Sequence, residues 1–191
     1  MISKNLPNIL SIFRIMMSPF FILFMIQDEP YFLLLSLFLI FVVSITDFFD
    51  GYYARKYKLV TELGKYLDPI ADKIFILTVL FTLYFILGND TFPLWMVVLI
   101  LLRDVFITIL RSFLKAKNLQ FTTSRLAKSK TLIQIVCMHL IVVILILNTF
   151  SILVIDYSSI YYIMFFCTAI TLLSGVGYIC QYYSKGLNGL Y

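Results

Sequence analysis

The chain has 191 residues, of which 62% are hydrophobic and 13% charged, with 15 Lys and Arg residues against 10 Asp and Glu residues. Soluble domains are nearer half apolar and a quarter charged, so this composition excludes an ordinary soluble enzyme, a disordered chain and a disulfide scaffold. The sequence has no basic run interleaved with aromatic residues, and we expect no nucleic-acid partner. The composition predicts an integral membrane protein.

Six apolar runs, each long enough to cross a bilayer as a helix, follow one another along the chain. Pro7 fits the start of the first helix, and Gly88-Asn89-Asp90 is typical of a turn. Because no linker or second domain is visible, residues 1–191 are predicted to form a single all-α, polytopic membrane domain. The six predicted spans are 9–26, 31–54, 68–87, 91–114, 130–147 and 157–183.

The charges between the spans predict the orientation in the membrane. Three alternate connections carry acidic residues and no Lys or Arg: Asp28 with Glu29, Asp90, and Asp156. The opposite ends carry most of the basic residues, which indicates that both termini and both long loops are cytoplasmic. The prediction is therefore six transmembrane helices, N-in and C-in.

Charges inside apolar spans are costly and are functional candidates for that reason. Asp47 with Asp50, and Asp68 with Asp72, are spaced so that each pair shares one helix face. The two helices are consecutive, so both pairs are expected to converge at the cytoplasmic ends, where carboxylates suit Mg²⁺, Mn²⁺ or Ca²⁺. A simpler interpretation also stands: Asp68-Pro69 is a good helix start, and Asp50-Gly51 a plain turn.

The stretch from Asp47 to Asp72 reads D-x2-D-G-x2-A-R-x8-G-x3-D-x3-D. It resembles the signature of the CDP-alcohol phosphatidyltransferase family at every fixed position, and the similarity extends to the six spans and cytoplasmic termini. The resemblance implies a homodimeric enzyme among the lipids of the bacterial inner (cytoplasmic) membrane, with its active site facing the cytoplasm. It further implies two divalent ions, Mg²⁺ or Mn²⁺, held by Asp47, Asp50, Asp68 and Asp72, with Asp72 also the general base.

The same resemblance implies a phosphatidyl donor, CDP-diacylglycerol, bound on the nucleotide side by Gly51, Arg55, Thr61 and Gly64. Arginine bonds phosphate oxygens bidentately, and glycine lets a phosphate approach the backbone closely. Gly51 is equally compatible with a turn, and Thr61 with simple loop polarity.

Within the family, the chain is most similar to members whose acceptor is sn-glycerol 3-phosphate. The similarity lies in residues 6–14, 103–111 and 127–131, with departures at Ser11, Asp104 and Ala127, where Thr, Glu and Gly are usual. It implies transfer of the phosphatidyl group to sn-glycerol 3-phosphate with release of CMP. The acceptor's phosphate would be bound by Arg103, Arg111, Lys128 and Lys130.

Alternatives stay open at this point. Lys128 and Lys130 are also typical of positive-inside anchors, and Arg111 could extend its side chain to the membrane surface. Arg103 could instead pair with its acidic neighbour Asp104. Arg14 could approach substrate or pair with an acid. The acceptor could be phosphatidylglycerol (cardiolipin synthesis), inositol phosphate or serine. A cation transporter that uses intramembrane aspartates is a further alternative, though it favours acids at mid-membrane on repeated, broken helices.

Overall fold

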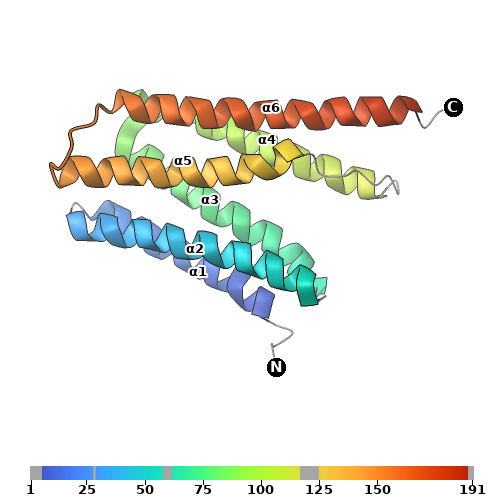
Figure 1. Ribbon diagram of the computed structural model, residues 1–191, viewed down its shortest axis with the longest axis horizontal. Coiled ribbons are helices and arrows are strands. Elements are labelled where there is room, and N and C mark those ends of the chain that lie inside the picture. Colours follow the sequence, from blue (N-terminus) through green and yellow to red (C-terminus); the bar gives the residue numbers. More distant parts are fainter. Residues whose placement is uncertain (1–5, 28, 58–61, 117–124, 189–191) are drawn as a thin grey trace. The chain divides into compact units, whose positions relative to one another are not determined.

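The structure is a computed structural model that describes residues 6–27, 29–57, 62–116 and 125–188, and within these ranges every regular element is a helix (Figure 1). The all-α prediction is therefore confirmed. In chain order the helices are α1 (Leu6–Ile26), α2 (Pro30–Tyr57), α3 (Glu62–Thr91), α4 (Leu94–Ala116), α5 (Arg125–Thr149) and α6 (Ser158–Asn188).

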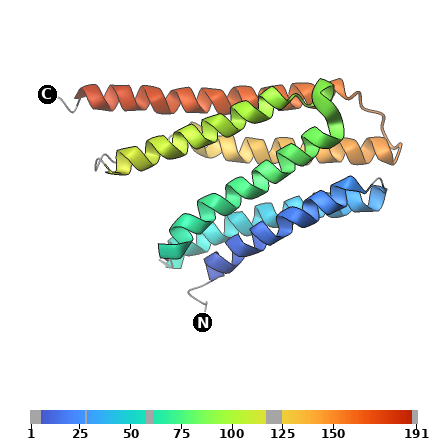
Figure 2. The same cartoon turned by 180° about the vertical axis from the view of Figure 1, so that it is seen from behind.

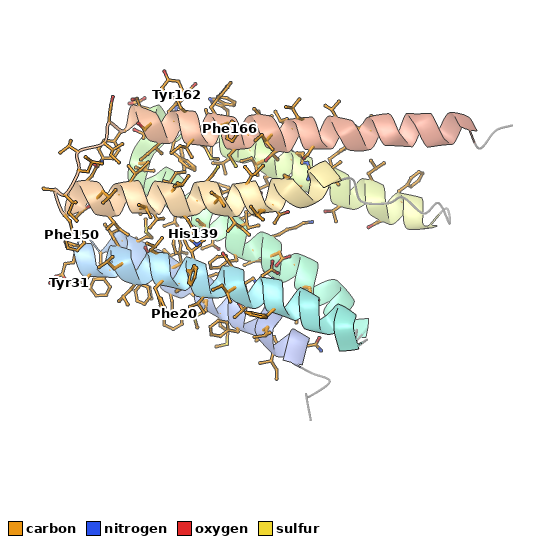
Figure 3. The ribbon with its side chains drawn as sticks, in the orientation of Figure 1. Phe20, Tyr31, His139, Phe150, Tyr162 and Phe166 are labelled. Carbon is orange, nitrogen blue, oxygen red and sulfur yellow. The ribbon has the colours of Figure 1, made fainter. Side chains whose placement is uncertain are left out.

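The chain forms two compact units, the first of Met1–Gly88 with Met138–Ile155 and the second of Asn89–Cys137 with Asp156–Tyr191. In the first unit α1 packs along α2 (Figure 1). Phe21 of α1 meets Phe75 of α3 edge-on, with ring centroids 6.4 Å apart. His139 of α5, labelled in Figure 3, is a packed histidine. Its ring lies edge-on to that of Phe41 on α2, with centroids 6.5 Å apart.

In the second unit α4 packs along α6 (Figure 2). Its buried apolar side chains include Met96 and Ile100 of α4 and Ile160 and Met164 of α6. The start of α6 is capped by Asp156, whose carboxylate accepts hydrogen bonds from the Ser158 hydroxyl (2.7 Å) and the Ser158 backbone N–H (3.2 Å). These bonds hold the pKa of the Asp156 carboxyl below its ordinary value.

Five of the helices contain segments long and apolar enough to cross a membrane: Asn8–Ile26, Pro30–Asp47, Ile70–Thr91, Lys130–Thr149 and Ser158–Gly177. A helix is the element expected there, because hydrocarbon offers backbone groups no other partner. Large apolar side chains on these helices face outward, among them Phe20, Tyr162 and Phe166 (Figure 3). The helix α4 is 23 residues long but carries Arg103, Asp104 and Arg111 within its apolar sequence.

The predicted helix order is correct, and most helices extend beyond the predicted spans, whereas α4 begins three residues later than predicted. The largest difference is in α3, which begins at Glu62, so Asp68-Pro69 lies inside the helix and is not its start. At Gly88 the backbone leaves the helical conformation with φ of 75°, which confirms the predicted turn and needs glycine. The Asn148 side chain closes the connection after α5 by bonding the backbone N–H (2.7 Å) and C=O (2.9 Å) of Ile155.

Candidate active site

Arg14 of α1 lies between two aspartates of the predicted metal site. One terminal guanidinium nitrogen, Nη2, lies 2.8 Å from Oδ1 of Asp47 on α2, and the other, Nη1, bonds Oδ1 of Asp72 on α3. The arginine side chain is 2% exposed, whereas the carboxylates of Asp47 and Asp72 are 35% and 42% exposed. The buried Arg14 guanidinium therefore connects α2 and α3 to α1 through their aspartates. The alternative that Arg14 pairs with acids is confirmed.

A third aspartate of the motif is held from the same helix. Ser11 of α1 is fully buried and donates a hydrogen bond from its hydroxyl to Oδ1 of Asp68 on α3. Ser11 and Arg14 are three residues apart, so they share one face of α1. The sequence does contain a signal for this contact, since Ser11 and Arg14 are polar and charged residues at helical spacing within an apolar run. The spacing alone does not identify the residues that they bond.

The remaining residues of the aspartate motif are placed less completely. Gly64 is buried in the first turn of α3. The backbones of Asp50, Gly51 and Arg55 are helical in α2, but their side-chain environments lie outside what the structure describes. Thr61 lies outside the described residues. The interpretation of Asp50-Gly51 as a plain turn is wrong, because both belong to α2.

The donor chemistry of the first unit fits a hard divalent cation. Asp47 and Asp72 come from different helices, and each places one carboxylate oxygen on the same guanidinium group. Carboxylate oxygens are the ligands that Mg²⁺ and Mn²⁺ prefer. Among the described residues, no group of three or more His, Cys, Asp or Glu side chains lies close enough to hold one metal ion.

A second charged cluster lies in the second unit. Nζ of Lys130 on α5 is 2.7 Å from each carboxylate oxygen of Asp104 on α4, and Nη1 of Arg103 is 3.1 Å from Oδ1 of the same aspartate. The Lys130 side chain is 5% exposed, the Arg103 side chain 11% and the Asp104 side chain 21%. Lys130 is therefore buried and ion-paired, not a surface anchor, and the pairing of Arg103 with Asp104 is confirmed.

Helix α6 supplies the surface on which Arg103 lies. Nη2 of Arg103 donates to the Ser174 hydroxyl at 2.7 Å, and Ser174 in turn donates to the Thr171 carbonyl at 2.7 Å. A Cβ atom on Gly175 would lie 3.3 Å from Cγ of Arg103, which is tighter than an ordinary contact. Gly175 thus gives the arginine stem the space to cross α6, and Ser174 is a partner that the sequence did not reveal.

This cluster has unused hydrogen-bonding capacity. In the part of the chain that the structure describes, Nε of Arg103 and both amide atoms of Gln134 are buried without a hydrogen-bond partner. Gln134 is fully buried and lies one turn after Lys130 on α5. Arg111 and Lys128 lie on α4 and α5, but their side chains are not among those described.

Comparison with known proteins agrees with the motif. The sequence profile of the family described as CDP-alcohol phosphatidyltransferase matches residues 4–176. Proteins named CDP-diacylglycerol–glycerol-3-phosphate 3-phosphatidyltransferase are similar to this chain. The one from Rickettsia bellii is 43% identical over 141 residues, covering 74% of this chain and 76% of its own length. The one from Bacillus subtilis is 38% identical over 144 residues, covering 69% and 73%.

Proposed function

Because the chain belongs to the CDP-alcohol phosphatidyltransferase family, we propose that it transfers the phosphatidyl group of CDP-diacylglycerol to sn-glycerol 3-phosphate, giving phosphatidylglycerol phosphate and CMP. The names of its relatives from Rickettsia bellii and Bacillus subtilis support this choice of acceptor. The observation that carries the proposal is the gathering of Asp47, Asp68 and Asp72, from two helices, around the Ser11–Arg14 face of α1.

In the proposed reaction an oxygen of the acceptor hydroxyl forms a bond to the phosphorus of the phosphatidyl group. The bond from that phosphorus to CMP breaks, and CMP leaves with the electron pair. Asp72 is proposed to take the hydroxyl proton: its side chain is 42% exposed, and it bonds Arg14 through Oδ1. Phosphoryl transfer depends more on positioning and charge neutralisation than on covalent help, and a site built of fixed charges suits that requirement.

Asp47, Asp50, Asp68 and Asp72 are the residues that would hold two divalent ions, Mg²⁺ or Mn²⁺. When bound, such ions neutralise the diphosphate and make the acceptor hydroxyl more acidic. The Ser11 hydroxyl fixes Asp68 from the side of α1, so this carboxylate presents its remaining lone pairs toward a ligand. Gly51, Arg55, Thr61 and Gly64 are proposed to bind the donor on the nucleotide side.

The charged cluster of the second unit is proposed to bind the acceptor's phosphate. Arg103 and Lys130 outnumber the carboxylate that they share, which leaves positive charge for an anion. The unpartnered Nε of Arg103 and the Gln134 amide supply donors that a phosphate or hydroxyl oxygen would satisfy, since buried polar groups rarely stay unbonded. Arg111 and Lys128 complete the proposed set.

The proposed placement is six spans with both termini cytoplasmic, in the inner membrane of a bacterium, with residues 1–191 acting as one domain and pairing as a homodimer. Five apolar helices and the distribution of basic residues support it. In this arrangement α4 crosses the membrane although it carries ionic residues. The pairing of Arg103 and Asp104 with each other and with Lys130 lowers the cost of burying those charges.

The test is an acceptor panel. Purified protein receives CDP-diacylglycerol and, in turn, glycerol 3-phosphate, phosphatidylglycerol, inositol phosphate or serine, and CMP release and the lipid product are measured. We expect CMP only with glycerol 3-phosphate. CMP release with another alcohol and none with glycerol 3-phosphate would show the acceptor to be wrong, and no release with any of them would refute the proposed reaction.

A further inference from the structure

Asp47 of α2 and Asp72 of α3, in the first unit, are joined by a cation that belongs to the protein. Asp47 and Asp72 both bond the Arg14 guanidinium, each through a different terminal nitrogen. A planar guanidinium is suited to bridge two carboxylates in this way, whereas a compact ammonium is a single point charge. The oxygens that Arg14 engages are the type of ligand that a divalent ion needs.

The arginine side of this contact is almost completely buried. Arg14 is 2% exposed, and removing one partner from a buried ion pair leaves an uncompensated charge. Two carboxylates on neighbouring helices repel one another unless a cation lies between them. Arg14 therefore does, without a ligand, what a metal ion would do for Asp47 and Asp72 when bound.

We infer that Arg14 is a resident counter-cation that holds Asp47 and Asp72 together while the site lacks metal, and that divalent ions bind in competition with it. The inference rests on the proposed function, because it takes these aspartates as metal ligands. Arg14 is thus a positioning residue. It holds the two carboxylates together before the metal binds, and its contacts with them break when the metal binds.

Competition has a measurable signature. A ligand that binds only molecules whose carboxylates are released has its affinity reduced by the fraction that is released. If Arg14 engages the carboxylates in about nine of ten metal-free molecules, its removal tightens metal binding about tenfold. The metal-free protein should at the same time become less stable, so affinity and stability change in opposite directions. A merely structural arginine would lower both.

The test compares the full-length wild type with Arg14→Gln, Arg14→Lys and the control Ser18→Ala, all in one detergent and depleted of metal. Ser18 is 4% exposed and donates to the Arg14 carbonyl at 3.2 Å, so its loss perturbs the same helix without touching a carboxylate. Mn²⁺ binding is measured by titration calorimetry, and metal-free stability by thermal unfolding. We expect Arg14→Gln to bind Mn²⁺ about tenfold more tightly than wild type, Arg14→Lys to be intermediate, and Ser18→Ala to bind as wild type does.

The outcomes separate the two proposals. Equal or weaker Mn²⁺ binding by Arg14→Gln overturns the competition while leaving the metal site itself in place. If Arg14→Gln does not fold without metal, Arg14→Lys, which keeps the positive charge, is the deciding variant. Tighter Mn²⁺ binding by Arg14→Lys than by wild type supports the inference, and equal or weaker Mn²⁺ binding overturns it. A wild type that binds no Mn²⁺ refutes the metal site of the proposed function, and the competition with it.

Discussion

Replacing Asp104 with asparagine would remove the carboxylate that two buried cations share. Lys130 lies 2.7 Å from each of its oxygens and Arg103 lies 3.1 Å from one. Removing one partner of a buried ion pair costs about 3–5 kcal/mol, because the other charge stays buried without compensation. The asparagine oxygen keeps one acceptor, and Asp104 is 21% exposed, so we expect a loss at the low end, about 3 kcal/mol.

For a chain of this size each kcal/mol shifts the unfolding midpoint by roughly 2–4 °C, so Asp104→Asn should lower it by roughly 6–12 °C. The midpoint is measured on the full-length protein in one detergent by helical circular dichroism and by the fluorescence of Trp95, the chain's one tryptophan. Asp90→Asn is the matched control, since it removes the same charge from an exposed position. A difference of about 2–4 °C between two midpoints corresponds to about 1 kcal/mol. If the midpoint of Asp104→Asn lies within that range of the control, the assigned ion pair is refuted.

A double-mutant cycle separates the pair from other effects of the substitution. Lys130→Met alone removes one of the two cations, and the double variant removes both members of the closest contact. We expect the double variant to lose at least about 1 kcal/mol less than the sum of the two single losses, because each single loss counts the same contact. Strict additivity would show that the two side chains are not energetically coupled.

The other expected outcomes follow from the same two clusters. Asp72→Asn should lower the rate of CMP release by about 10²–10⁴-fold while the folded protein still binds CDP-diacylglycerol, and near-normal turnover would exclude the base role. Chelation with EDTA should abolish CMP release, and Mg²⁺ or Mn²⁺ should restore it; activity that persists in EDTA would contradict the metal requirement. Gly175→Ala should be about 1–2 kcal/mol less stable in thermal unfolding than Gly177→Ala, because a Cβ at Gly175 meets Arg103 at 3.3 Å whereas one at Gly177 meets nothing within 4 Å. Equal stability of these two variants would show that Arg103 does not need the space.

The helices could be predicted because apolar runs of bilayer length leave few other structures open to the backbone. Their ends could not, because the polar sequence beyond the apolar run continues the helix: α3 starts at Glu62, before the Asp68-Pro69 pair that resembles a start. Proline was the misleading signal. Its ring favours a first helical turn, yet Pro69 lies well inside α3.

The residues of the candidate site could likewise be predicted only in part. Spacing along one helix correctly placed Asp68 and Asp72 on α3, and the motif indicated that Asp47 belongs with them. It could not show that Ser11 and Arg14 are what these acids bond, nor that Ser174 is the partner of Arg103, because such contacts depend on which helices are neighbours. For Arg14 the cost of burying a charge required some acid, and the alternatives stayed open for lack of tertiary information.

The two charged clusters have the same arrangement with opposite signs: in each, one group pairs with two groups of opposite charge. In the first unit one cation, Arg14, serves Asp47 and Asp72, and in the second one carboxylate, Asp104, serves Arg103 and Lys130. Among the described contacts each counter-ion is outnumbered by the charges that it serves, which leaves charge of one sign in each cluster. The surplus is negative where divalent cations are proposed and positive where a phosphate is proposed. Full neutralisation by a second arginine beside Asp72, or a second aspartate beside Lys130, would stabilise the empty protein and weaken the binding that the surplus charge provides.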